Sequence, residues 1–242
     1  MASNPIRCTS KTSVGRVRSL NEDAFAVRPD IALWMVADGM GGHNKGNVAS
    51  NMACEEIVSA VANGLSIPAA IQHCHQKIQL KGFRSERHRG MGTTVICVSR
   101  DATKLQVFWV GDSRAYLWHD ECLTQITKDH SVVQNMLELG TITKSQARRH
   151  PKRHIITQSV GAEMISDLTI GHVSTDFVQQ DKLLICSDGL HDQVSEQEIQ
   201  TLFMHQQDSA TLVDELVNKA NEQGGQDNIT TLILELDHTA SD

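Results

Sequence analysis

Residues 34–42 read WMVADGMGG, an apolar run that delivers Asp38 into a glycine-rich turn. A similar setting recurs in VFWVGDSRAY, LLICSDGL and GGQDNIT, which carry Asp112, Asp188 and Asp227. Another acidic site, NEDAF at residues 21–25, precedes a further strand-like run. A buried carboxylate is unfavourable unless an opposite charge compensates it. One Asp-Gly turn is usually only a turn, but this repetition beside apolar runs favours oxygen ligands that share a cluster of cations.

Six motifs occur in order along the chain: GRVRSLNEDAF, VADGMGGH, GMGTT, VGDSRAY, CSDGL and GGQDNITTLIL. Each motif alone is a weak signal, because short strings such as GDSR occur by chance. In this order and at this spacing they resemble the motif set of the metal-dependent PP2C-type (PPM) serine/threonine protein phosphatases. DGMGG, where eukaryotic members have DGHGG, resembles the bacterial branch. The resemblance runs from about Thr12 to Leu236, nearly the whole chain.

The composition is typical of a soluble globular protein. With 242 residues, 40% hydrophobic and 21% charged, we expect a single catalytic domain over residues 1–242. The net charge of -7 argues against nucleic acid as a partner. No apolar run approaches the roughly 20 residues that cross a bilayer, and MASNPIRCTS lacks the features of a signal peptide. We therefore expect no membrane association, a cytoplasmic location and free cysteines.

Short apolar runs and amphipathic segments in blocks predict an α+β protein with antiparallel sheets. The expected strands are Ile6–Thr9, Ala24–Val27, Ala32–Val36, Thr94–Val98, Leu105–Val110, Ala115–Trp118, Leu168–Val173, Lys182–Cys186 and Thr230–Leu236. The expected helices are Asn47–Ala62, Ala69–Leu80, Glu196–Met204 and Ala210–Asn221. A further helix follows Asp129, which we expect to cap it. The resemblance implies more, namely a four-layer αββα sandwich of two antiparallel β-sheets flanked by helices.

The resemblance also implies the ligands of a binuclear centre that binds two Mn²⁺ or Mg²⁺ ions tightly. Asp38 would bridge both ions. Glu22 and the carbonyl of Gly39 would hold one ion, and Asp188 and Asp227 would hold the other. Hard oxygen ligands of this kind suit both metals.

Two more aspartates have implied roles near these ligands. Asp23 would act in catalysis together with Asp38, by orienting metal-bound water. Asp112, with Asp188, matches the position of a weaker third metal in bacterial members. In its own sequence context Asp112 could also be a hairpin-turn residue, and that alternative stays open although the metal role is favoured. The ions would activate water for in-line attack on phosphorus.

Arg18 matches the arginine that grips phosphate in the family, and its planar fork suits phosphate oxygens. The alternative is a surface arginine like its neighbour Arg16. One departure concerns the acid that protonates the leaving group. Where eukaryotic members have histidine after Asp-Gly, this chain has Met40, which cannot donate a proton. His43 is near in sequence, but its direction cannot be read, so the general acid is left open.

The predicted function is hydrolysis of phosphoserine and phosphothreonine in proteins, in bacterial signalling opposed to a eukaryotic-like serine/threonine kinase. The expected partners are phosphoproteins and that kinase, and the expected state is a monomer. Two alternatives remain at this point. One is a non-catalytic phosphoprotein-binding module on the same fold, which decayed ligands would indicate, and none is missing. The other is a metal-dependent phosphoesterase with a non-protein substrate, because a metal site reads the phosphate and not the leaving group.

Residues 139–162 contain five lysines and arginines and no acidic residue, in a chain of net charge -7. By resemblance they belong to the flap, about residues 131–162, which lies beside the active site. ARRHPKRH within it predicts an exposed loop. The residues expected to bind protein substrates are Arg148, Arg149, Lys152 and Arg153. Charge runs usually only keep a loop solvated, so that alternative is equally open.

Overall fold

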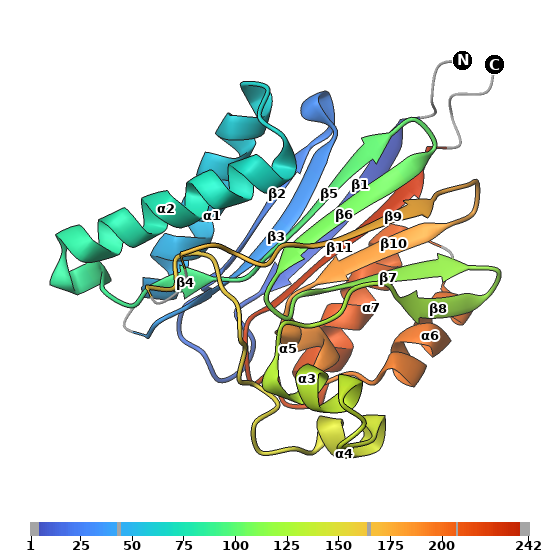
Figure 1. The fold of residues 1–242 in the computed structure, drawn as a ribbon. Coiled ribbons are helices and arrows are strands. Elements are labelled where there is room, and N and C mark those ends of the chain that lie inside the picture. Colours follow the sequence, from blue (N-terminus) through green and yellow to red (C-terminus); the bar gives the residue numbers. More distant parts are fainter. Residues whose placement is uncertain (1–4, 43–44, 164–165, 207, 238–242) are drawn as a thin grey trace.

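The computed structural model describes residues 5–42, 45–163, 166–206 and 208–237. Two antiparallel β-sheets lie face to face between two layers of helices (Figure 1). The first sheet has the order β1-β11-β10-β7-β8. Its strands are β1 Ile6–Ser13, β11 Ile229–Leu236, β10 Lys182–Cys186, β7 Arg114–His119 and β8 Cys122–Gln125. The predicted αββα sandwich is confirmed.

The second sheet has the order β2-β3-β5-β6-β9, with the two-residue β4 paired to β3. Its strands are β2 Asp23–Arg28, β3 Leu33–Met40, β4 Gly92–Thr93, β5 Val95–Asp101, β6 Lys104–Val110 and β9 Gly171–Asp176. Helices α1 Lys45–Ala62 and α2 Ile67–Arg84 cover this sheet. Helices α5 Asp188–His191, α6 Glu196–His205 and α7 Ser209–Glu222 cover the first sheet. Short helices α3 Val132–Glu138 and α4 Lys144–Arg148 belong to the flap, and single 3-10 turns cover Pro29–Ile31 and Glu86–His88.

The four structural layers pack against one another through three apolar cores. Because side chains alternate along a strand, one strand contributes residues to two of these cores. In β3, Leu33 and Met35 face the helices α1 and α2, whereas Trp34 faces the layer between the sheets. In β11, Ile233 faces α6 and α7, whereas Leu234 faces the other sheet. Successive strand residues point to opposite faces, so a continuous apolar run is what a strand between two cores requires.

Two predicted elements differ from the structure. The strand expected at Leu168–Val173 is β9, Gly171–Asp176. Its predicted first residue, Leu168, packs instead against the α1 and α2 core before pairing with β6 begins at Gly171. The helix after Asp129 is capped by Ser131, whose hydroxyl accepts from the Gln134 amide at 3.2 Å.

Candidate metal centre

The acidic residues singled out from the sequence meet at one end of both sheets. Asp23 opens β2 and pairs across the sheet with Asp38, near the end of β3. Asp188 follows the end of β10, and Asp227 precedes β11, whose start pairs with the end of β10. Asp112 lies in the connection from β6 to β7, which crosses from one sheet to the other. The structure therefore brings together residues up to 204 positions apart in the printed sequence, from Asp23 to Asp227.

The carboxylates at this centre raise one another's pKa. Burial raises the pKa of Asp38 well above its usual range, and the charges of Asp188, Asp23, Asp112 and Asp227 raise it further. The pKa of Asp188 is also raised well above its usual range, by burial first and then by Asp112 among other carboxylates. Like charges so placed are unfavourable unless cations balance them.

Asp188 carries the clearest sign of a missing partner. Its Oδ1 is buried and makes no hydrogen bond within the described part of the chain. A buried polar atom without a partner is rare in folded proteins, and an ion is one accepted reason for it. Together with the carboxylates of Asp38, Asp112 and Asp192 around it, this atom fits a hard divalent cation. The residues present thus suit the metal that the sequence implies.

Asp23, in the second sheet, is held by hydroxyl groups at one end of the first sheet and not by a positively charged side chain. Its Oδ2 accepts from Ser187 Oγ at 2.8 Å and from Thr230 Oγ1 at 2.7 Å. Burial is the largest influence on this carboxyl and raises its pKa to about 6, although the two hydroxyl hydrogen bonds act in the opposite direction. Oδ2 of Asp23 is therefore fixed by hydrogen bonds within the protein, as expected for a carboxylate that orients a ligand with its other oxygen.

Glu22 and Gly39 form the junction between β2, β3 and α1. The Gly39 amide donates to the Glu22 carbonyl at 3.2 Å, and the Asn47 amide donates to Glu22 Oε1 at 3.4 Å. A Cβ at Gly39 would lie 2.1 Å from the carbonyl oxygen of Gly46. Glycine is needed here because the first turn of α1 touches the strand, whatever the Gly39 carbonyl binds.

Arg18 lies at the centre, in direct contact with a predicted ligand. Its Nη2 donates to Asp227 Oδ2 at 2.7 Å, and both side chains are partly exposed. This contact is the main cause that raises the pKa of Arg18 above its usual value. In the structure the Arg18 guanidinium is therefore paired with the Asp227 carboxylate.

Asp112 is a buried residue of the β6–β7 connection. Its backbone carbonyl accepts a hydrogen bond from His191 Nε2 at 3.1 Å. Burial, followed by the charge of Asp129, raises the pKa of the Asp112 carboxyl to about 7. Asp129 itself binds Arg114 through both carboxylate oxygens, with a shortest distance of 2.7 Å. Asp129 therefore anchors the connection rather than the following helix.

Sequence reasoning missed a group that closes the centre from the flap side. His154, Asp188 and Asp192 each offer an atom within 4.8 Å of the others, and His154 Nδ1 lies 2.8 Å from Asp192 Oδ2. Asp192 stands four residues after Asp188, one helical turn, and this spacing was a usable signal. His154 had none, because only the fold of the flap brings it here. His43, whose direction could not be read from the sequence, lies outside the described residues.

Of the predicted substrate-binding residues, Arg148 and Arg153 line a cavity of about 370 Å³ between the flap and the centre. Asp112 and Asp192 line the same cavity. Arg149 and Lys152 are exposed on the flap outside it. The predicted loop ARRHPKRH begins within α4, which Thr143 opens with a capping box to Gln146. No helix among the described residues is long and apolar enough to span a membrane.

The metal-free protein should lose stability as the pH rises from about 5 to 7, between the ordinary pKa of an aspartate and the raised pKa of Asp112, which is about 7. The raised pKa values of Asp112, about 7, and of Asp38 and Asp188 mean that the folded state binds more protons than the unfolded state in this range. Their contribution to stability is complete at low pH and is lost as each ionises. The lowered pKa of His191 acts mainly below about pH 6.5, where it works in the opposite direction and, as one group against three, only reduces this slope.

Thermal unfolding in a chelator measures this slope, and Mn²⁺ should remove most of it. Asp188→Asn should flatten the slope in the chelator and raise the metal-free Tm. A metal-free Tm that rises with pH over this range would contradict the assignment of repelling carboxylates.

The geometry agrees with three comparisons. The model of the protein phosphatase 2C family matches residues 12–233. The serine/threonine phosphatase stp of Listeria monocytogenes is 34% identical over 242 residues, 95% of each chain. The serine/threonine phosphatase PstP/Ppp of Mycobacterium tuberculosis has a similar structure, with a TM-score of 0.87 and 31% identity over 96% of this chain and 99% of that one.

A structure of the catalytic domain of PstP in complex with two manganese ions is also similar. It has a TM-score of 0.83 and 29% identity, and covers 95% of this chain and 97% of that one. These matches span nearly the whole length of both partners, and the family named by the sequence motifs is confirmed. The chain belongs to the protein phosphatase 2C family and is a metal-dependent protein phosphatase.

Proposed function

We propose that this chain dephosphorylates phosphoserine and phosphothreonine in proteins, at a centre held by Asp38, Asp188 and Asp227. The observation that carries the proposal is the buried, unpartnered Oδ1 of Asp188 within a cluster of carboxylates that repel one another. The named relatives support the substrate class, since they are serine/threonine phosphatases.

The residues fit two ions in the arrangement that the motifs implied. Asp38 would bridge them, Glu22 and the Gly39 carbonyl would hold one, and Asp188 and Asp227 the other. Such ions supply activated water and balance the negative charge that develops on the phosphoryl group. The two manganese ions of the similar PstP domain favour Mn²⁺ over Mg²⁺. The buried carboxyl of Asp112, whose pKa is about 7, would give a weaker third site together with Asp188.

Two other side chains would act directly on the substrate and on water. Arg18 would leave Asp227 and grip the phosphate oxygens with its planar fork, because both are anionic acceptors for the same donors. Asp23 would use its second oxygen to orient the attacking water, since Ser187 and Thr230 fix the first. Met40, the last residue of β3, has no proton to donate to the leaving group.

Phosphate release from phosphothreonine peptides should require Mn²⁺ and should exceed release from phosphotyrosine peptides and from a nucleotide. Asp38→Ala and Asp227→Ala should each abolish this activity while the fold persists, because each removes a ligand and a source of repulsion. Turnover and calorimetric Mn²⁺ titration decide the outcome. A fully active Asp38→Ala variant would exclude the two-ion centre, and preference for the nucleotide would favour a non-protein phosphoester. Absence of activity with every substrate would favour a binding module.

Arg18→Ala should raise KM for the phosphopeptide by about 5- to 150-fold, the effect of losing one charge-assisted contact of roughly 1–3 kcal/mol. Mn²⁺ affinity should stay within a few-fold of wild type, or increase, because Arg18 competes for Asp227. Arg18→Lys should recover only part of the loss. Collapse of metal binding with an unchanged KM would instead make Arg18 a structural residue.

Asn228 joins the segment from Val14 to Glu22, which contains Arg18, to the first sheet. Its Oδ1 accepts from the Glu22 amide at 2.7 Å, and its Nδ2 donates to the carbonyls of Val14 and Leu20, each at 2.9 Å. The side chain is buried, and three hydrogen bonds fix both ends of the stretch that contains Arg18. Asn228 therefore positions Arg18 and Glu22 without touching substrate.

Asn228→Asp should raise KM and weaken Mn²⁺ binding together, each by about tenfold. The aspartate can still accept from the Glu22 amide but cannot donate to Val14 and Leu20. Asn228→Ala should lose more on both measures, because it leaves all three backbone groups unpaired. Thermal unfolding provides the control. An Asn228→Asp variant that loses Tm but keeps both KM and Mn²⁺ affinity would limit Asn228 to stability.

The flap gives the centre a positive border. Arg148, Arg149, Lys152 and Arg153 are all exposed, and two of them face the cavity that reaches Asp112 and Asp192. An anionic phosphoprotein would be attracted to this border more strongly than a small aryl phosphate, since it presents more charge to the flap. We therefore assign these four residues to recognition of protein substrates and not to the chemistry.

Reversal of all four to glutamate should lower kcat/KM for a phosphoprotein by at least about tenfold and barely change that for an aryl phosphate. Added salt should reduce the difference, because it screens exposed charges. Equal losses on both substrates, or no loss on either, would leave the flap charges as a solvated surface.

We also propose a cellular location, a kinase partner and an oligomeric state for this phosphatase. A phosphoprotein phosphatase without a spanning helix among its described residues suits a cytoplasmic signalling role, opposite a serine/threonine kinase. No partner subunit is needed to complete the centre, since all its groups come from one chain, and we propose a monomer. Light scattering and co-purification with a kinase test these assignments.

A further inference from the structure

A second pocket lies at the other end of the first sheet, away from the metal centre. It is a cavity of about 870 Å³. The same strands reach both sites: β10 begins at Lys182 in the pocket and leads to Asp188, and β11 starts beside Asp227 and brings Glu235 to the pocket. The five residues of β10 alone span roughly 17 Å. Nothing in the proposed chemistry uses this pocket.

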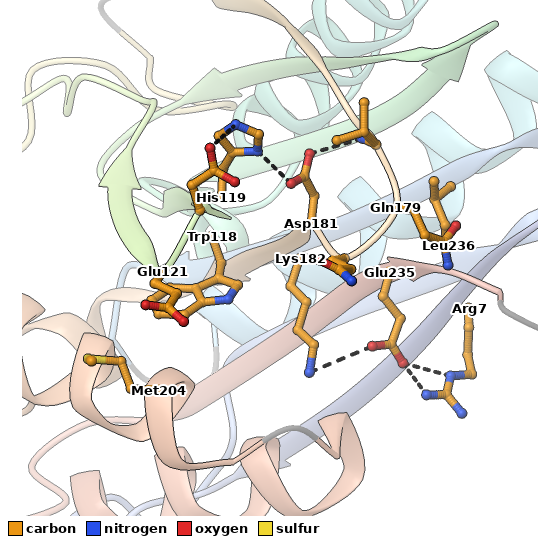
Figure 2. A pocket seen from close by; sticks show the side chains of 13 residues that line it. Arg7, Trp118, His119, Glu121, Gln179, Asp181, Lys182, Met204, Glu235 and Leu236 are labelled. Atoms are coloured by element: carbon orange, nitrogen blue, oxygen red, sulfur yellow. Dashed lines mark hydrogen bonds and ion pairs between the residues drawn. The ribbon is translucent and has the colours of Figure 1, made fainter.

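Buried charges line the pocket. Asp181, Lys182 and Glu235 are 4%, 8% and 6% exposed. Glu235 is balanced by Arg7 and Lys182, and Asp181 by His119 at 2.7 Å (Figure 2). Among the described residues, every other buried lysine, arginine or acidic side chain belongs to the metal centre or to Asp129 beside it. Burying charged groups costs free energy, so the charged residues at this end of the sheet call for an explanation other than core packing.

One carboxylate on the rim of the pocket has no counter-charge. Arg7 and Lys182 pair with Glu235, and His119 contacts both Asp181 and Asp120, so Glu121 is the lining carboxylate without an ion pair among the described residues. Asp120 and Glu121 form the turn between β7 and β8, with φ of 46° and 59°. This turn favours asparagine and glycine, so its geometry does not explain a glutamate. Within the described chain, no hydrogen bond or ion pair engages the Glu121 carboxylate.

Apolar surface adjoins these acids. Met204 of α6 and Val178 are about half exposed, at 51% and 49%, and both line the pocket together with Trp118. Figure 2 shows the hairpin, α6 and the strand ends contributing side chains around one opening. A long basic side chain suits such a surface, because its stem packs on apolar groups while its charged head reaches a carboxylate or an aromatic face.

We propose that this pocket docks a basic segment of a partner protein. An arginine or lysine of that segment pairs with Glu121 and lays its stem along Met204 and Trp118. Docking here leaves the metal centre open, so a phosphoprotein held by the pocket can still present a phosphate elsewhere.

The probe is the peptide acetyl-Leu-Arg-Leu-amide, with acetyl-Leu-Glu-Leu-amide as its acidic counterpart. The chain has three tryptophans, so the indole N–H signals of ¹⁵N-labelled protein can report on Trp118 directly. The arginine peptide should shift the Trp118 signal at millimolar concentration, and the glutamate peptide should not. Glu121→Lys should weaken the arginine peptide at least about tenfold.

Glu55→Lys is the matched control, since it makes the same change of charge on an exposed residue of α1. It should leave peptide affinity unchanged, and both variants should keep wild-type activity on an aryl phosphate. The proposal is overturned if no Trp118 shift occurs in the wild type, or if Glu55→Lys loses as much affinity as Glu121→Lys. Preference for the glutamate peptide would also overturn it, in favour of an anion site at Arg7 and Lys182.

Discussion

Repulsion among carboxylates at one end of the two sheets is the constraint on which the rest of this structure depends. Asp38, Asp188 and Asp112 are each brought there by a strand. Asp112 raises the pKa of Asp188, and both raise the pKa of Asp38. Repulsion among these charges destabilises the fold, and bound cations remove that cost. Metal dependence is thus a consequence of how the chain folds, as well as a requirement of the phosphate chemistry.

Neutral hydrogen bonds around the centre keep the repelling groups in place. Ser187 and Thr230 fix Asp23, and Asn228 fixes the segment that leads to Glu22. Glycine at position 39 lets α1 touch β3, which brings the Asn47 amide to the Glu22 carboxylate. None of these groups adds a charge of its own. The scaffold can therefore be rigid with or without bound ions, and the site is pre-formed for them.

The first sheet connects two different polar environments. At one end it presents carboxylates that require a cation, and at the other it buries Asp181, Lys182 and Glu235 in internally balanced pairs. Strand β10 and the middle of β11 are apolar on both faces, because they lie between two cores. In these two strands the charged groups, Lys182 and Glu235, are consequently confined to the end at the distal pocket.

The sequence by itself determined the α+β class and the position of the acidic residues at strand ends, because apolar runs and turn residues are local features. Its six ordered motifs determined the family, and the resemblance to that family implied the αββα architecture. Only the tertiary structure decided which groups meet. The pairing of His154 with Asp192 depends on how the flap folds, and that of Arg114 with Asp129 on a connection between the sheets. The tie from Asn228 to Val14, and the burial of Lys182, arise from strands adjacent in the sheet but distant in sequence. Local patterns cannot encode such contacts, since they form between segments whose separation along the chain carries no periodic signal.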